Sequence, residues 1–261
     1  NRDISMTEGT GFKLERLPAD GGHVAIFTIH GRSRLNLVGA DVLAQCTRGI
    51  RAASDSEVRC AVLQGASQSA FVGGADLLEL QALEPHNAAG FVAAIHGLCS
   101  AIREFPVPVV ARLQGHCLGG GLEIAAACDI RVADSSAFFG MPEVRVGVPS
   151  VVEAALLPML IGWGKTRELV YRGNIVDAEE AARIGLIEQL TEPDHLDDKI
   201  TEIVNDIVHA APNAIRLQKD LCRQWEGLAP DAAIEAGLKT FAQAYESDEP
   251  ARYCEKFFLK K

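Results

Sequence analysis

The sequence predicts an α/β protein with a helical region at its C-terminus, and three observations support this. Between residues 12 and 133, segments with strand patterns alternate with segments that have helical spacing, an order typical of α/β domains. Between residues 151 and 247, almost every segment has helical spacing. The length of 261 residues suits one domain with a full core and a small appendage.

The first half of the chain supplies the strands. An alternating segment predicts a strand at 12–17, and an apolar segment after a Gly-Gly turn predicts one at 23–29. Three short apolar runs predict strands that are covered on both faces, at 58–63, 107–113 and 130–133. Helical spacing predicts helices at 40–53, 76–83, 88–104 and 119–128. The third of these helices stops before Pro106.

The second half is expected to be helical at 151–160, 164–171, 178–183, 196–211, 214–225 and 231–247. Asp177 with Glu180, and Ser150 with Glu153, fit the capping box that begins many helices. We expect three parts: a disordered or tag-derived N-terminus at 1–11, a core with the active site at 12–200, and a helical region at 201–261.

Composition excludes several classes of function. The net charge of −10 disfavours a general nucleic-acid role, which depends on basic patches. No apolar run approaches the roughly 18–20 residues that span a bilayer, and the first residues are too polar for a secretory signal. The seven cysteines form no Cys-x-x-Cys pair and predict a reduced, cytoplasmic protein. The histidines lack the spacing of metal ligands, so no metal site is expected.

The segment Gly119-Gly120-Gly121 is the first candidate for chemistry. A strand enters it and a helix leaves it, so its amides can point at an anion and benefit from the helix dipole. Glu123 follows in an apolar helix, where a buried carboxylate is costly unless it is paired or used. The alternative is a tight turn without a ligand, followed by a glutamate that complements the dipole at a solvated end.

Two further segments complete the candidate site. Glu143 follows the rigid Pro142, and two carboxylates in one pocket would form a general acid–base pair. The segment 70–77 ends in a helix with Asp76 as a typical cap, and a backbone N–H of this segment would be a second donor for an oxyanion hole. The alternatives are an ordinary loop glutamate paired with Arg145 and a plain capped helix.

These segments, taken together, resemble the enoyl-CoA hydratase/isomerase (crotonase) superfamily. Five motifs carry the resemblance in the family's order and spacing: residues 70–76, 108–123 with Gly-Gly-Gly-x-Glu, 128–130, 139–143 and 178–186. The resemblance implies a crotonase-type spiral of ββα units over residues 12–200. It also implies that residues 201–261 form a region for trimerisation, so that the protein is a homotrimer or a dimer of trimers.

The resemblance also assigns roles to residues. Ala75 and Gly120 match the backbone donors of the oxyanion hole, and Glu123 and Glu143 match the catalytic glutamates of true hydratases. Glu123 would activate the water and Glu143 would deliver a proton to C2. Coenzyme A would enter only as part of the substrate thioester, with no permanently bound cofactor and no metal. The residues expected beside the thioester are Gly74, Asp76, Leu77 and Gly119.

The sequence departs from the family pattern in two places. The segment after Glu143 is one residue shorter before Pro149 and bulkier after it, which predicts a reshaped acyl pocket formed by Val148, Val151, Val152 and Glu153. Glu153 is either a third carboxylate there or the capping partner of Ser150. The usual lysine near the nucleotide is missing, so the CoA contacts are expected from Arg32, Arg34, Phe258 and, from a neighbouring subunit, Lys261.

The function that the resemblance implies is hydration of a 2-enoyl-CoA, as in fatty acid metabolism. An enoyl-CoA isomerase, or another lyase or hydrolase of the superfamily, is the alternative that keeps the same enolate. A non-catalytic CoA-ester-binding scaffold is the alternative from a different class. His116, where the family usually has an apolar residue, is expected to pack beside the site rather than to act as a catalyst.

Overall fold

The larger sheet has six strands in the order β1-β2-β3-β5-β7-β10. All neighbouring strands pair in parallel except β1 and β2. In the computed structural model, which describes residues 10–259, these strands are β1 (Gly11–Ala19), β2 (Gly22–His30), β3 (Val58–Gly65), β5 (Val109–Leu113), β7 (Ile130–Asp134) and β10 (Gln189–Thr191).

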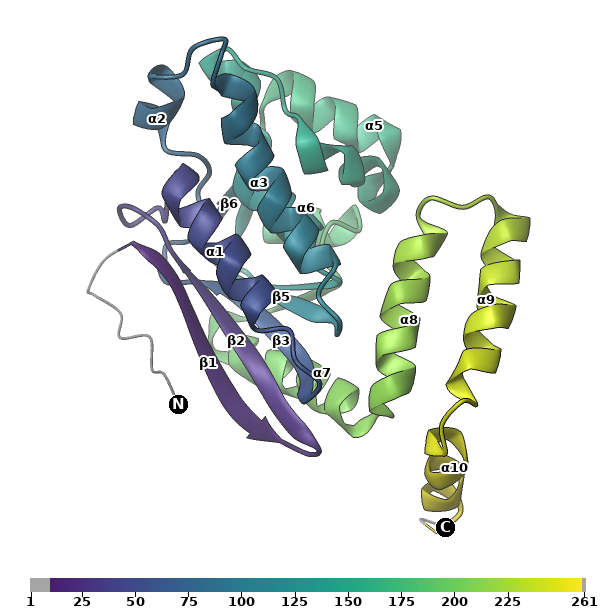
Figure 1. Cartoon of the computed structure of the whole chain (residues 1–261). Coiled ribbons are helices and arrows are strands. Elements are labelled where there is room, and N and C mark those ends of the chain that lie inside the picture. Colours follow the sequence, from purple (N-terminus) through teal and green to yellow (C-terminus); the bar gives the residue numbers. More distant parts are fainter. Residues whose placement is uncertain (1–9, 260–261) are drawn as a thin grey trace.

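Helices cover both faces of this sheet, which explains why β3 and β5 are continuous apolar runs. One face packs against α1 (Ala40–Ala52) and α3 (Ala88–Arg103), which lie side by side (Figure 1). The other face packs against α7 (Leu196–His209), whose buried residues recur at helical spacing: Leu196, Ile200, Val204 and Val208.

A second sheet of four short strands was not predicted from the sequence. Its order is β4 (Ala70–Val72), β6 (His116–Leu118), β8 (Phe138–Gly140) and β9 (Ile175–Asp177). Each of the first three follows a long strand of the larger sheet, and the next helical segment comes after it. These helices are α2 (Leu77–Gln81), α4 (Gly120–Ala126) and the 3₁₀-helix η1 (Glu143–Val146). This repeat of two strands and a helix is the predicted ββα spiral.

The helices after residue 150 differ in detail from the expectation. The 3₁₀-helix η2 (Val152–Leu156) leads into α5 (Leu157–Arg172), which joins two predicted helices across a kink at Gly162, where φ is +72°. Asp177 caps α6 (Ala178–Arg183) by accepting a hydrogen bond from the N–H of Glu180, as predicted. A 3₁₀ turn, η3 (Pro193–His195), precedes α7.

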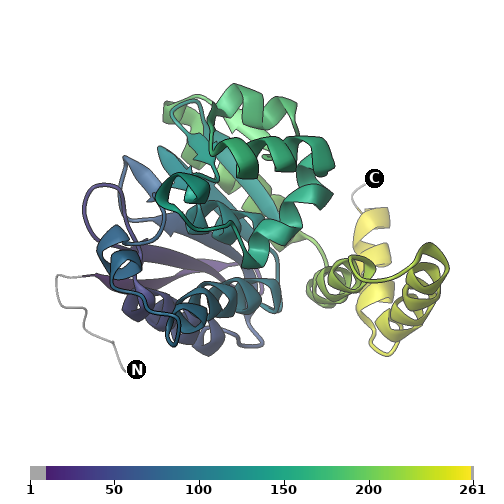
Figure 2. The same ribbon diagram turned by 90° about the horizontal axis from the view of Figure 1, so that it is seen from above.

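The last three helices extend away from the rest of the molecule (Figures 1 and 2). They are α8 (Pro212–Trp225), α9 (Pro230–Ala244) and α10 (Glu249–Leu259). Because α7 packs on the sheet, the structure places the start of the extended part at α8 rather than at residue 201. Arg216 anchors α8 to the core by donating to the carbonyl of Val58, and Lys219 does so by pairing with Asp129.

Candidate active site

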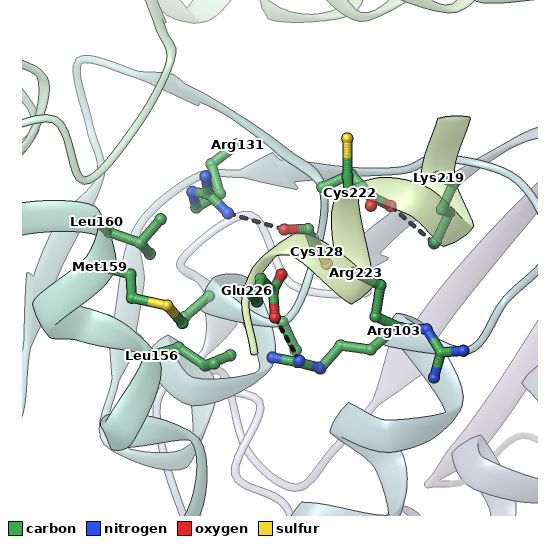
Figure 3. A pocket seen from close by; sticks show the side chains of 13 residues that line it. Arg103, Cys128, Arg131, Leu156, Met159, Leu160, Lys219, Cys222, Arg223 and Glu226 are labelled. Atoms are coloured by element: carbon green, nitrogen blue, oxygen red, sulfur yellow. Dashed lines mark hydrogen bonds and ion pairs between the residues drawn. The ribbon is translucent and has the colours of Figure 1, made fainter. Parts of the chain in front are cut away.

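Two cavities differ in whether the polar side chains that line them are already paired. The first lies between α5 and α8 and has a volume of about 380 Å³ (Figure 3). Its buried cations are already used: Arg131 pairs with Glu188 and donates to the carbonyl of Cys128, and Lys219 pairs with Asp129. These groups therefore hold the fold together, and the cavity is not the candidate site.

The second cavity, of about 530 Å³, brings the predicted chemistry together. It is lined mainly by apolar side chains from the α2–α3 region and by the segment after η1. Ala75, Gly120, Glu123 and Glu143, which come from three distant parts of the sequence, all line it. An apolar cavity with a few converging polar groups is the usual form of a small-molecule site.

The glycine segment places a helix start against this cavity. Gly119 has φ of +55° at the end of β6, and its N–H donates to the carbonyl of Gly140 at 2.9 Å. A Cβ on Gly119 would lie 2.7 Å from Oε1 of Glu143, and one on Gly121 would lie 2.0 Å from the carbonyl oxygen of Val72. Only glycine allows both the positive φ at Gly119 and the close contact of Gly121 with the backbone of Val72.

Two backbone N–H groups at the cavity are left without a partner. The backbone of Val38 forms hydrogen bonds with both neighbours of Ala75. Its carbonyl accepts from the N–H of Asp76 at 3.0 Å, and its N–H donates to the carbonyl of Gly74 at 3.0 Å. The N–H of Ala75 therefore points away from Val38. Gly120 begins α4, so its N–H has no acceptor in the helix. Within residues 10–259, neither N–H donates a hydrogen bond.

The two glutamates are held by different neighbours. Glu123 is only 3% exposed, and its Oε1 accepts a hydrogen bond from the N–H of Ala154 at 3.2 Å. Glu143 is partly buried, and its Oε2 accepts from Oγ of Ser150 at 2.8 Å. The second oxygen of each carboxyl lies at the start of α4. A Cβ on Gly120 would be 3.9 Å from Oε2 of Glu123, and one on Gly119 would be 2.7 Å from Oε1 of Glu143.

Burial makes both carboxyls weaker acids than usual, and for Glu123 the charge of Glu143 adds to this effect. Burial, followed by the charge of Glu143, raises the pKa of Glu123 to about 8; the Ala154 N–H acts in the opposite direction, and the charge of Glu153 adds a smaller increase. Burial also raises the pKa of Glu143, while the Ser150 hydroxyl acts in the opposite direction. Glu123 therefore holds a proton near neutral pH.

Several residues expected beside coenzyme A have other contacts or lie elsewhere. Gly74, Leu77 and Gly119 line the cavity, whereas Asp76 caps α2 by accepting from the N–H of Leu78 at 3.0 Å. Arg32 pairs with Asp76 at 2.7 Å, so both serve the turn before α2.

Arg34 and Phe258 do not line the cavity. Arg34 is exposed. Phe258 lies on α10, in the part of the molecule that extends away from the core (Figure 1). Lys261 lies outside the described residues.

The segment after Glu143 differs from the prediction. Val148 and Val151 line the cavity, but Val152 and Glu153 do not. The capping box of Ser150 and Glu153 is wrong, because the Ser150 hydroxyl donates to Glu143 and the carboxylate of Glu153 contacts His96. A tertiary contact thus takes the place of the local one.

Sequence reasoning missed the contribution of α3, which lines the cavity with Phe91, Val92 and Ile95. The helical spacing of these residues signals a buried face but not the partner of that face. His116 is half-buried in β6 and stacks on Phe138, with ring centroids 5.7 Å apart, so it packs and lies outside the cavity lining.

Two further observations concern the described residues. Residues 10–259 contain no group of three or more His, Cys, Asp or Glu side chains placed to hold a metal ion. A search of the same residues finds no helix with the length and apolar character to cross a membrane.

Comparisons with known proteins agree with this geometry. Residues 20–259 match the family model described as enoyl-CoA hydratase/isomerase. The short-chain-enoyl-CoA hydratase of Clostridium acetobutylicum is 33% identical over 92% of this chain and 93% of its own length. The crotonyl-CoA hydratase of Syntrophomonas wolfei is 29% identical over 91% of this chain and 92% of its own length.

A solved structure is similar over nearly the whole chain. The enoyl-CoA hydratase of Bacillus anthracis superposes with a TM-score of 0.90 at 25% identity, covering 96% of this chain and 97% of that one. The fold is therefore that of the crotonases. With the family match over most of the sequence, the chain belongs to the enoyl-CoA hydratase/isomerase family.

Proposed function

We propose that this protein is an enoyl-CoA hydratase that adds water across the 2,3 double bond of a 2-enoyl-CoA. One observation supports this above the others: an apolar cavity brings together two carboxyls, Glu123 and Glu143, and two backbone N–H groups that donate no hydrogen bond within residues 10–259. Addition of water next to a thioester needs a site for the enolate oxygen, a base for the water and an acid for C2.

The backbone donors stabilise the charge that develops during the reaction. The thioester oxygen lies between the N–H groups of Ala75 and Gly120, and it becomes an enolate oxygen when water attacks C3. The start of α4 adds the partial positive charge of a helix N-terminus. One donor of this kind is worth about 3–4 kcal/mol of transition-state stabilisation in related acyl chemistry.

The glutamate pair manages the protons. One carboxylate takes a proton from water while the other carboxyl gives one to C2, so the pair works with a single proton. The assignment of Glu123 as the base stays a prediction. Since the raised pKa of Glu123 places the proton on Glu123 in the free enzyme, that assignment requires the proton to pass to Glu143 before water attacks.

The cavity favours an uncharged acyl group. The side chains of Phe91, Val92, Ile95, Val148 and Val151 form an apolar surface beside the two glutamates. Burying an apolar acyl chain there is favourable by about 25 cal/mol per Å², whereas a carboxylate would need a cation. Arg145 also lines the cavity, but its guanidinium donates to the carbonyls of Gly173 and Arg172. Coenzyme A takes part only as the carrier of the acyl group.

We also propose that the protein is a homotrimer or a dimer of trimers. Helix α9 has no buried residue. Its large apolar side chains, together with that of Tyr245 directly after its end, recur on one face at helical spacing and are all at least 64% exposed: Ile234, Leu238, Phe241 and Tyr245. An apolar stripe of this size is typical of an interface. Phe258 and Lys261 of a neighbouring copy would then supply CoA contacts. The five buried cysteines are unpaired, which supports a cytoplasmic location.

The assembly is tested by placing a charge on this stripe. Phe241→Glu is expected to shift the sedimentation coefficient from that of a trimer or hexamer towards that of a monomer, because a buried unpaired carboxylate opposes association. Lys239→Glu, on the same helix but in an ion pair with Glu235, is the matched control and should leave the assembly intact. A wild-type monomer, or a trimer unaffected by Phe241→Glu, contradicts the proposal.

The activity is tested with crotonyl-CoA. We expect the absorbance of the conjugated thioester to fall on addition of the enzyme, because hydration removes the double bond from conjugation. Acyl chains of increasing length define the size of the pocket. If no 2-enoyl-CoA loses absorbance while a 3-enoyl-CoA is converted, the protein is an isomerase and the hydratase proposal is wrong.

A further inference from the structure

The carboxylate of Glu153 is buried next to the candidate site without lining it. Its side chain is only 7% exposed, and Oε1 lies 2.8 Å from Nδ1 of His96. Its Oε2 is buried and forms no hydrogen bond within the part of the chain that the structure describes. His96, by contrast, is 60% exposed, so one side of the pair contacts solvent. A carboxylate with an unsatisfied buried oxygen destabilises the fold, which calls for a functional reason.

The backbone links this carboxylate to Glu123. Glu153 precedes Ala154, whose N–H donates to Oε1 of Glu123, and η2 packs against both α3 and α4. A single short segment therefore both holds Glu123 and places a second carboxylate close to it. Charges in a buried environment interact more strongly than charges in water.

We propose that Glu153, held in place by His96, is a positioning residue whose negative charge keeps the proton of the catalytic pair on Glu123. The inference rests on the proposed function, because the pair needs that one proton for catalysis. Glu153 itself contacts no reacting atom; it acts through Glu123. The charge of Glu153 contributes to the raised pKa of Glu123, after burial and the charge of Glu143.

The other titratable groups around this cluster do not cancel the effect. Glu123 faces Glu143 on η1 and the thiol of Cys99 on α3, whose pKa is raised by burial and by the charges of Glu153 and Glu123. The charged groups of α5 are engaged elsewhere, since Lys165 and Arg172 pair with Glu168, and Arg167 lies over the ring of Trp163. His96 is therefore the titratable side chain in direct hydrogen-bonding contact with Glu153.

The test measures the pKa of Glu123 directly by ¹³C NMR of carboxyl-labelled protein, with Glu123→Gln used to assign the signal. Glu153→Gln keeps the shape and an oxygen for His96 but removes the charge. It is expected to lower the pKa of Glu123 by about half a unit or more and to move the alkaline limb of kcat/KM to lower pH. His96→Gln removes the ring that contacts Oε1 but keeps the carboxylate of Glu153, and it is expected to lower neither quantity.

The matched control is Glu226→Gln, which removes a carboxylate from the half-exposed pair with Arg103 in the other cavity and should shift neither quantity. The proposal is overturned if Glu153→Gln behaves like this control, or if His96→Gln and Glu153→Gln shift the pKa of Glu123 in the same direction. Because the NMR titration needs no substrate, its failure is distinguishable from a failure of the hydratase proposal.

Discussion

Glu123→Gln is expected to lower kcat for enoyl-CoA hydration by about 10²–10⁴-fold, because an amide can neither hold nor transfer the proton that the reaction needs. Glutamine keeps an oxygen to accept the N–H of Ala154, so the segment that follows Ser150 should stay in place. Steady-state kinetics with crotonyl-CoA measures the loss. A variant that retains more than about a tenth of the wild-type kcat would contradict a role for Glu123 in proton transfer.

The same substitution is expected to stabilise the fold at alkaline pH. The pKa of Glu123 rises from an ordinary 4.5 to about 8 on folding, so between these values the folded state holds a proton that the unfolded state has released. The free energy of unfolding therefore decreases as the pH rises through this window, by about 5 kcal/mol in total. Glutamine does not titrate and avoids this loss.

Thermal denaturation between pH 5 and pH 9 checks the sign. The difference in Tm between Glu123→Gln and the wild type should grow in favour of the variant up to about pH 8 and then level off. Glu226→Gln, which removes an exposed carboxylate, serves as the control. A difference that stays constant with pH would mean that Glu123 is not the buried, proton-holding carboxyl that the geometry indicates.

Some features of the candidate site and of the fold have local signals in the sequence. Gly119, Gly120 and Glu123 have such local signals, because a tight turn, an open helix start and a carboxylate in an apolar helix can be seen in the sequence itself. The long strands are predicted for the same reason, since β3 and β5 carry their burial in their own composition.

The second sheet could not be predicted, because its strands are three residues long and owe their hydrogen bonds to distant partners. Phe138–Gly140 pairs with His116–Leu118 on one side and with Ile175–Asp177 on the other. Strand formation of this kind depends on tertiary context rather than on propensity. Ser150 shows the same limit, because its capping pattern with Glu153 is local while its actual partner, Glu143, is brought there by the fold.

Glu143→Gln is expected to lower kcat by a similar factor of about 10²–10⁴. The substitution also removes the negative charge of Glu143 next to Glu123. Removing the charge of Glu143 should lower the pKa of Glu123, because that charge is the second largest cause of the raised value. Carboxyl NMR of the free enzyme measures the shift. Ser150→Ala is the matched comparison: it leaves Glu143 in place without its hydroxyl donor, so we expect a smaller loss of kcat.

The two glutamine variants together distinguish the candidate functions. Addition of water needs a base and an acid at once, so a hydratase should lose hydration in both variants, whereas an isomerase can move its proton with one carboxylate and should tolerate one of the two substitutions. A scaffold that only binds CoA esters should keep its affinity and show no turnover in any form. Hydration that survives in either Glu123→Gln or Glu143→Gln at near wild-type rate would therefore contradict the paired mechanism, however well the cavity binds its substrate.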